Sequence, residues 1–219
     1  SFAYIASHDL KEPLRGIHNF SSFLMEDYGE TLDNDGVSKL ETLMRLTKRM
    51  ENLIDSLLHY SRLGRTELFL HTTDLNEIVN NAVDVIRISK NKDFDIRIQR
   101  QLPTIRCDKT QISELFSNLI SNALKYNDNT EKWVEIGFIN PVVDVEEYQL
   151  LYNHRSDSKP PIIFYVRDNG IGIRSKHLET VFRIFKRLHA PNRYGGGTGA
   201  GLTIVKKIVE RPQWNYLGR

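Results

Sequence analysis

The chain has 219 residues, of which 40% are hydrophobic and 26% are charged; these are ordinary values for a globular protein long enough to bury a core. Its net charge of +2 excludes a strongly basic binder of nucleic acids or membrane surfaces. The single cysteine, Cys107, excludes an internal disulfide and a cysteine-rich zinc site, and we expect it to be buried.

No apolar run approaches the roughly 18 residues of a membrane helix, and the N-terminus lacks the pattern of a signal peptide. We therefore expect a cytoplasmic protein without a membrane segment. Because the sequence begins on Ser1 rather than methionine, we expect it to be part of a longer protein.

Two heptad stripes run through the first 65 residues. The first is Leu10, Leu14, Ile17, Ser21, Leu24 and Tyr28, and the second is Leu40, Leu43, Thr47, Met50, Ile54, Leu57 and Ser61. Heptad spacing keeps a narrow seam toward a partner helix, and "YGETLDNDG" between the stripes is rich in turn residues. We predict an all-α hairpin that dimerises into a four-helix bundle; the alternative is a hairpin packed on the rest of the chain.

The stretch "SHDLKEPLRG" places Pro13 inside the first of these helices, where proline costs roughly 3 kcal/mol. Pro13 removes the donor to the carbonyl of Asp9, so any bend falls beside His8. At about 100° per residue, His8 lies about 160° from Leu10 and faces away from the seam. On position alone, an ordinary surface histidine explains it too, and the other histidines show no metal-ligand spacing.

From residue 66 onward, strands and helices mix without strict alternation. Strands are predicted at "ELFLHTT", "FDIRIQ", "PTIRC", "KWVEIGFI" and "PIIFYVRD", and helices at "LNEIVNNAVDVIRIS", "QISELFSNLISNALKY", "SKHLETVFRIF" and "LTIVKKIVE". Asp74 and Asp108 are candidate helix caps, and residues 140–161 are predicted to be a loop or extended hairpin. We expect two domains, 1–65 and 66–219, the second an α+β sandwich with helices on one face of a mixed sheet.

The stretch "NLISNALKYN" places Asn118 and Asn122 four residues apart on one helix face, with Lys125 one turn further and Tyr126 beside it. Two carboxamides and an ammonium can hold a magnesium ion and phosphate oxygens, because magnesium takes few protein oxygens and usually binds together with substrate phosphates. A polar helix face in water also explains the stretch.

In "RDNGIGI", Asp168 ends an apolar strand and is followed by Gly170 and Gly172. A buried carboxylate at a strand end can accept a hydrogen bond from an exocyclic amine such as that of adenine, and glycine lets the backbone approach a ligand. Taken alone, the stretch is also a common turn.

The stretch "GGGTGAGL" opens a helix, so its backbone amides and the helix N-terminus suit a phosphate. It lacks the Gly-Lys-Ser/Thr ending of a P-loop and does not directly follow a strand, as a dinucleotide fingerprint would. A flexible loop is the alternative.

In this order, the motifs closely resemble the catalytic core of sensor histidine kinases over almost the entire chain. "SHDLKEPLRG" is similar to the phosphoacceptor box, "NLISNALKY" to the N box, "DNGIGI" to the first glycine box, "VFRIFKRLH" to the F box and "GTGAGL" to the second glycine box. The sequence around His8 and the stretch "IFKRLH" are most similar to those of the kinases of cyanobacterial phytochromes and related light sensors.

The resemblance implies a homodimer whose helical bundle is linked to an ATP-binding domain of the gyrase and histidine-kinase type. It implies that His8 is the phosphoacceptor, that Asp9 draws off its proton, and that Asn122 is a magnesium ligand supported by Asn118. The resemblance places Lys125 and Tyr126 along the nucleotide, and it places Asp168, Gly170 and Gly172 at the adenine. It makes Phe182 and Phe185 the anchors of a lid. The residues that it places at the phosphates are Gly197, Thr198, Gly199, Gly201 and Leu202.

The resemblance further implies that Pro13 loosens the helix beside His8 and that the phosphoryl group passes to an aspartate of a response-regulator receiver domain. It also implies a sensory domain upstream of Ser1. Glu12 stands where many relatives carry threonine or asparagine, so phosphatase activity toward the receiver is not implied. Ala200 replaces a common leucine or isoleucine.

The ending "VERPQWNYLGR" lacks the glycine turn and two strands with which relatives continue. Either the sheet is incomplete at one edge or "QWNYLG" supplies part of it. Two alternatives to an active kinase follow: a dimeric scaffold with impaired catalysis, and a gyrase-like ATPase without transfer to histidine.

Overall fold

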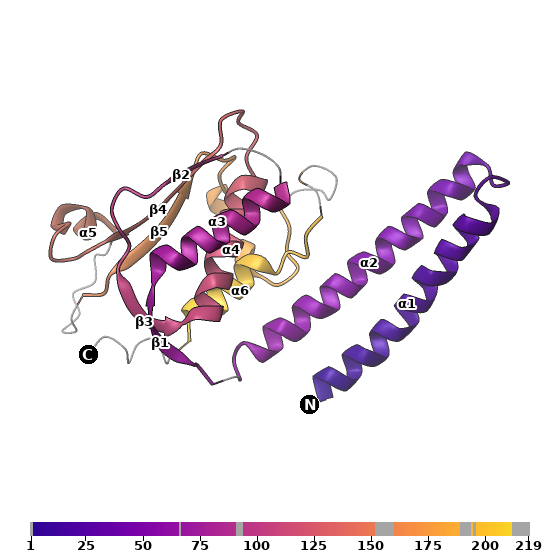
Figure 1. The fold of residues 1–219 in the computed structure, drawn as a ribbon, viewed down its shortest axis with the longest axis horizontal. Helices are drawn as coiled ribbons and strands as arrows, with labels where there is room; N and C mark the ends of the chain where they lie inside the picture. The colour runs from indigo at the N-terminus through magenta and orange to yellow at the C-terminus, as the bar shows by residue number, and fades with distance from the viewer. Residues whose placement is uncertain are drawn as a thin grey trace.

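The structure is a computed structural model and describes residues 2–65, 67–90, 94–151, 160–188, 194 and 196–211. A long helical hairpin extends from a part that combines sheets and helices, as predicted (Figure 1). Within the described residues, no helix is both long and apolar enough to cross a membrane.

The hairpin consists of α1 (Phe2–Tyr28) and α2 (Asn34–Arg62). Asp33 caps α2, since its side chain accepts a hydrogen bond from the backbone N–H of Gly36 at 2.7 Å. Where the helices meet, Leu14, Ser21 and Thr47 are buried. The seam inside one hairpin is therefore formed largely by small and polar members of the predicted stripes.

The strands form two open sheets rather than the single mixed sheet that we predicted. The antiparallel pair β1 (Leu70–Asp74) and β3 (Thr104–Asp108) forms one sheet. The other has the order β2 (Asp95–Arg97), β4 (Trp133–Ile139), β5 (Ile163–Asp168), with β2 parallel and β5 antiparallel to β4. Each of β1 and β3 ends directly in a helix, so their pairing is limited to five residues.

Helices α3 (Leu75–Lys90), α4 (Lys109–Lys125) and α6 (Gly201–Val209) lie on one side of the three-stranded sheet (Figure 1). Asp74 accepts a hydrogen bond from Asn76 N at 2.8 Å, and Asp108 accepts from Thr110 N and Gln111 N at 3.1 Å. Both predicted helix caps are thus confirmed.

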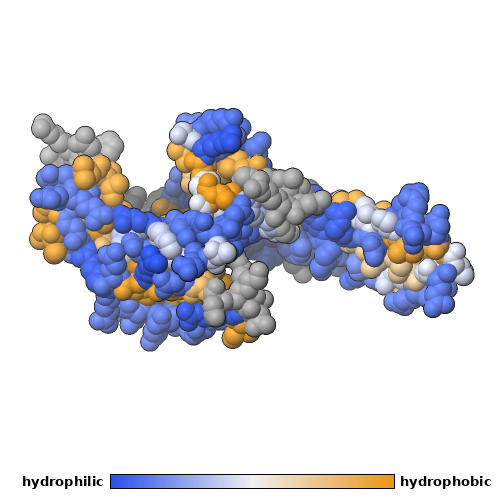
Figure 2. All heavy atoms as spheres, turned by 90° about the horizontal axis from the view of Figure 1, so that it is seen from above, coloured by the Kyte–Doolittle hydropathy of each residue, from blue (hydrophilic) through white to orange (hydrophobic). Residues whose placement is uncertain are grey.

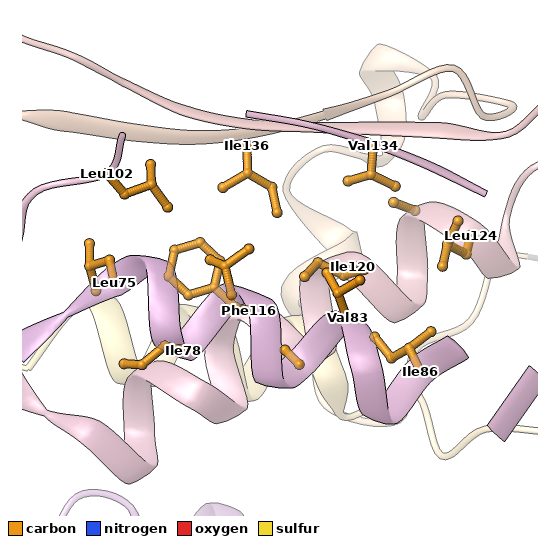
Figure 3. Packing of buried hydrophobic residues seen from close by; sticks show 13 residues of the cluster. Leu75, Ile78, Val83, Ile86, Leu102, Phe116, Ile120, Leu124, Val134 and Ile136 are labelled. Atoms are coloured by element: carbon orange, nitrogen blue, oxygen red, sulfur yellow. The ribbon is translucent and has the colours of Figure 1, made fainter. Parts of the chain in front are cut away.

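The main core lies between β4 and the helices α3 and α4. Val134 and Ile136 of β4 point toward Ile78, Phe116 and Ile120 (Figure 3), and each of these side chains is at most 4% exposed. Burial of such side chains contributes roughly 25 cal/mol per Å² of apolar surface, so this layer fixes α4 against the sheet.

Cys107 is fully buried at the end of β3, as predicted. Burial raises the pKa of its thiol, and a thiol that stays protonated is a poor nucleophile.

The prediction of one helix over "SKHLETVFRIF" is wrong. The structure has two short 3-10 helices, η1 (Ser175–His177) and η2 (Thr180–Phe182). The Thr180 hydroxyl donates to His177 O at 3.1 Å and competes with helical backbone pairing. Leu178, Phe182 and Phe185 follow a helical spacing but stay 37–51% exposed, so no core stabilises a longer helix here.

The loop predicted over residues 140–161 contains a helix, α5 (Val145–Leu151), at the end of the sheet far from the hairpin (Figure 1). Asp144 precedes it and Glu147 follows three residues later, a spacing typical of a capping box. The predicted edge segment "QWNYLG" lies outside the described residues.

The end of α2 packs against α4 and α6. Leu63 joins a small buried cluster with Ala200, Ile204 and Ile208, and His59 Nε2 lies 2.7 Å from a carboxylate oxygen of Glu114 on α4. The hairpin is therefore docked on the second part of the chain rather than tethered to it loosely.

Candidate functional site

A pocket of about 400 Å³ opens between α4, the end of β5 and the start of α6, within the usual range of roughly 300–1,000 Å³ for ligand sites. The structure brings together most of the residues that the sequence singled out. Those lining the pocket are Asn118, Asn122, Lys125, Tyr126, Asp168, Gly172, Gly197, Thr198, Gly199, Gly201 and Leu202.

The first wall is the polar face of α4. Asn118 Nδ2 donates to Glu114 O of the same helix at 3.0 Å, which directs the carboxamide oxygen toward the start of α6. There, a β-carbon added to Gly201 would lie 2.8 Å from Asn118 Oδ1 and 3.6 Å from Asn122 Nδ2. Only glycine allows α6 to begin this close to the two carboxamides.

The second wall is the turn after β5. Asp168 Oδ1 accepts a hydrogen bond from Gly170 N at 2.7 Å, and Ile171 N donates to Tyr126 O at 3.0 Å, which ties the turn to the end of α4. The expectation that the Asp168 carboxylate is buried is wrong: the residue is exposed, because the strand ends in the open pocket.

The third wall is the glycine-rich loop. Gly199 has φ = +76°, and a β-carbon there would lie 3.0 Å from Lys186 O. Its carbonyl accepts a hydrogen bond from Phe185 N at 3.1 Å, and Phe185 itself has φ = +63°. This left-handed geometry is uncommon for a bulky residue, and it joins the end of the phenylalanine segment to the glycine loop.

Three of the residues predicted to contact the nucleotide, Gly170, Phe182 and Phe185, lie outside the pocket lining. Gly170 holds the Asp168 carboxylate through its N–H, and Phe185 contributes its backbone to the loop. Phe182 lines a separate cavity behind the pocket, where Thr203 Oγ1 donates to its carbonyl at 2.9 Å.

Sequence reasoning missed Lys186 and Arg187, which both line the pocket. Arg187 Nη1 donates to Gly197 O at 3.3 Å, and Lys125 Nζ donates to Gly196 O. Two basic residues directly after a phenylalanine motif were the available signal. With Lys125, the described residues of the lining include three cations against one carboxylate, that of Asp168, so this part of the pocket favours an anionic ligand.

Asn169 was also missed. Its Oδ1 accepts hydrogen bonds from Asn127 Nδ2 at 2.8 Å and Trp133 N at 3.0 Å, while its Nδ2 donates to Glu131 O at 2.8 Å. Asn169 therefore fixes the turn that carries Asp168 to the loop between α4 and β4.

His8 and Asp9 lie on α1, outside the pocket lining. Both side chains are about 70% exposed, and His8 Nδ1 lies 3.7 Å from Asp9 Oδ1. The exposure matches the predicted orientation of His8 away from the seam. In this docked arrangement the candidate phosphoacceptor and the pocket belong to separate parts of the molecule.

Chemically, the pocket combines apolar walls with a carboxylate at one end and cations with backbone amides at the other. Its apolar members include Leu119, Val166, Ile171, Ile173 and Val181. An apolar slot next to a carboxylate suits a flat base with an exocyclic amine, and a cationic glycine loop suits phosphates.

Two family profiles match the chain. Residues 1–66 match the "His Kinase A (phospho-acceptor) domain", and residues 107–216 match the "Histidine kinase-, DNA gyrase B-, and HSP90-like ATPase". Among solved structures, full-length ShkA in complex with AMPPNP covers 94% of this chain and 40% of its own, with a TM-score of 0.59 and 21% identity. The ShkA structure therefore has the same fold as this chain.

Curated relatives match over nearly the whole chain. Cyanobacterial phytochrome B of Nostoc sp. (strain PCC 7120) is 62% identical over 96% of this chain, and phytochrome-like protein Cph1 of Synechocystis sp. (strain PCC 6803) is 33% identical over 97%. The chain spans 26% of the length of each. These matches confirm the predicted family and its likeness to phytochrome kinases: the chain belongs to the sensor histidine kinases, as a catalytic core with a phosphoacceptor part followed by an ATPase-type part.

Proposed function

We propose that this chain uses Mg-ATP to phosphorylate His8 and that the phosphoryl group then passes to an aspartate of a response-regulator receiver domain. The observation that carries the proposal is the pocket, which gathers eleven residues from three motifs far apart in the sequence around one cationic slot. We also propose that the division near residue 65 separates the dimerisation and phosphotransfer domain from the ATP-binding domain.

In the nucleotide, the exocyclic amine of adenine donates to Asp168, whose second role is to hold Gly170 N. Lys125 and Tyr126 lie along the sugar and phosphates, and the loop from Gly197 to Leu202 faces the phosphates. Lys186 and Arg187 add positive charge where the transferred phosphoryl group carries negative charge, which is the main catalytic requirement of phosphoryl transfer.

Magnesium fits the donor set of the α4 wall. No group of three or more His, Cys, Asp or Glu residues able to hold a metal occurs in the described ranges, and the carboxamides of Asn118 and Asn122 both line the pocket. A hard cation held by one or two protein oxygens and by substrate phosphates needs no larger ligand set. Asn122 would hold the ion with support from Asn118, and the bound ion would neutralise phosphate charge.

For the transfer itself, the unprotonated ring nitrogen of His8, which carries the lone pair, attacks the γ-phosphorus of ATP; an N–P bond forms while the bond from that phosphorus to the β–γ bridging oxygen breaks, and ADP leaves with the electron pair. The Asp9 carboxylate, 3.7 Å from His8 Nδ1, is close enough to stabilise the positive charge that develops on the ring. Since α1 contributes nothing to the pocket lining, the hairpin must leave its docked position, or the partner protomer must supply the histidine. Pro13, inside α1, weakens the helix one turn from His8.

We further propose that the hairpin forms a homodimeric four-helix bundle. Phe20, Phe23, Leu43 and Met50 are 44–71% exposed on a single hairpin, and hydrophobic surface is visible toward its free end in Figure 2. Large apolar side chains exposed on both helices of a hairpin are typical of an interaction surface. An upstream sensory domain and a cytoplasmic location, where ATP is supplied, complete the proposal.

Asp168→Asn tests the nucleotide site. Asparagine keeps an oxygen for Gly170 N and so preserves the turn, but it removes the charged acceptor for the adenine amine. ATP affinity measured by calorimetry should fall by about tenfold or more. Asp95→Asn, which removes a surface carboxylate paired with Arg97 at 2.7 Å, should leave it unchanged. Equal affinity in Asp168→Asn and wild type would contradict the assignment.

A further inference from the structure

A second cavity, of about 640 Å³, lies where the end of α2 meets α6. Tyr60 and Gly64 line it from the hairpin side, and Phe182, Lys206, Lys207 and Arg211 line it from the other side. It lies behind the nucleotide pocket, outside every motif that the family resemblance uses except Phe182. Because both parts of the chain contribute walls, an occupant of this cavity would touch both.

The cavity is strongly cationic. Among the described residues that line it, three are cations, Lys206, Lys207 and Arg211, and one is a carboxylate, Glu210, which lies 3.6 Å from Lys206 Nζ. In the described part of the chain, no carboxylate lies within 4.0 Å of Lys207 Nζ. Instead, this ammonium donates to Tyr60 O at 2.7 Å and lies 3.8 Å from the centroid of the Tyr60 ring.

The surroundings of Lys207 disfavour its positive charge. Burial lowers the pKa of the Lys207 ammonium, and the positive charges of Arg65 and Arg211 lower it further. Like charges near a partly buried ammonium raise its electrostatic free energy, and an anion beside Lys207 would lower it.

We propose that this cavity is a binding site for a phosphate group, which bridges the end of α2 and α6 and stabilises the docked arrangement of the hairpin. Ammonium and guanidinium groups donate strong, charge-assisted hydrogen bonds to phosphate oxygens. The cavity also presents the Tyr60 and Phe182 rings, so the phosphate can be the free ion or part of a phosphorylated small molecule. The proposal does not depend on kinase activity.

The cavity is placed to influence the nucleotide pocket. On η2, Val181 lines the nucleotide pocket and Phe182 lines the second cavity. On α6, Leu202 lines the nucleotide pocket and Thr203 lines the second cavity. Thr203 Oγ1 donates to Phe182 O at 2.9 Å and joins the two segments. The same two elements therefore form a shared wall between the sites.

The test uses the whole chain with its nucleotide pocket saturated by a non-hydrolysable ATP analogue, so that added phosphate cannot bind there. Equilibrium dialysis with labelled inorganic phosphate should show one saturable site per chain. Lys207→Met should weaken binding by about tenfold, Glu210→Gln should tighten it, and Lys48→Met, which removes an exposed lysine from α2, should change nothing. Phosphate should also slow hydrogen exchange of the amides of residues 63–65.

Lys207→Arg keeps the positive charge but changes the contact with Tyr60, and it should bind phosphate as wild type does. Retained binding would show that Lys207→Met weakens binding through the lost charge and not through the lost Tyr60 contact. Unlabelled glucose 6-phosphate distinguishes the sources: displacement at lower concentrations than inorganic phosphate identifies a phosphorylated small molecule as the ligand, and the reverse order identifies the free ion. Phosphate binding that disappears with the ATP analogue, that is not saturable, or that is equal in Lys207→Met and wild type would overturn the proposal.

Discussion

The carboxamide of Asn118 shows how single residues shape the proposed nucleotide site. Its nitrogen is held by the carbonyl of Glu114 within α4, so its oxygen faces Gly201. Because Gly201 has no side chain, this oxygen can lie close to the start of α6. Residue-scale changes at this contact should therefore alter ligand binding without unfolding the protein.

Gly201→Ala is the direct test of that contact. The new methyl group would lie 2.8 Å from Asn118 Oδ1, so the carboxamide must turn away from the pocket, and ATP affinity in the presence of magnesium should fall by about tenfold. The melting temperature should not fall, because alanine favours a helix more than glycine does. Gly16→Ala is the matched control, since nothing lies within 4 Å of its added β-carbon. A large loss of stability with intact affinity would contradict the account.

At the scale of elements, helix α5 buries Tyr148 and is preceded by a cluster of polar contacts. Arg100 forms an ion pair with Asp144, whose carboxylate also accepts a hydrogen bond from Asn140 N at 2.7 Å. The Arg100 hydrogen bond and then the Asn140 hydrogen bond lower the pKa of Asp144. The folded state thus binds its proton less readily than the unfolded state does.

The pH dependence of α5 follows from this shift. A carboxyl group with a lowered pKa contributes stability above its unfolded pKa of about 3.9, and that contribution is lost as the pH falls through the folded pKa. Hydrogen exchange of residues 140–151, corrected for intrinsic rates, should be unchanged between pH 7 and pH 5 and should increase in more acidic solution. Asp144→Asn should show the faster exchange already at pH 7. Protection that is equal in Asp144→Asn and wild type would count against this role of Asp144.

Much of the element order follows from sequence, because periodicity and caps are local. The four-residue spacing of Asn118 and Asn122 predicted their shared helix face, and Asp108 predicted where that helix begins. Local patterns mislead where packing decides: Leu178, Phe182 and Phe185 imitate a helix but find no core. The spacing of Asp144 and Glu147 could have revealed α5, whereas pairing into two sheets is a non-local outcome.

The candidate site was predicted well where its members belong to motifs and poorly where they do not. Two basic residues after the phenylalanine motif hinted at Lys186 and Arg187, but the sequence did not predict the left-handed conformation of Phe185 or its hydrogen bond to Gly199, which precede them. Asn169 acts through three contacts with a distant loop. The contact between α2 and α6 could not be predicted from the sequence either, since it joins Tyr60 and Lys207, which are 147 positions apart.

At the scale of the whole molecule, the exposed apolar side chains of the hairpin lead us to expect a homodimer. Light scattering should give twice the 25.4 kDa mass of the chain. Leu43→Glu combined with Met50→Glu should give the monomer, because two charges on a buried seam are costly. Lys48→Glu, on the opposite face of α2, should remain a dimer. A wild-type monomer at micromolar concentration would contradict the proposed bundle.

The central claim is that His8 receives the phosphoryl group from ATP bound in the pocket. The most direct measurement is incorporation of label from γ-labelled ATP with magnesium into wild type and His8→Gln, both shown to be folded by circular dichroism. Alkali-stable, acid-labile label is expected on wild type alone. Label that persists in His8→Gln, or its absence from folded wild type, would contradict it; the latter result would favour a signalling scaffold with impaired catalysis.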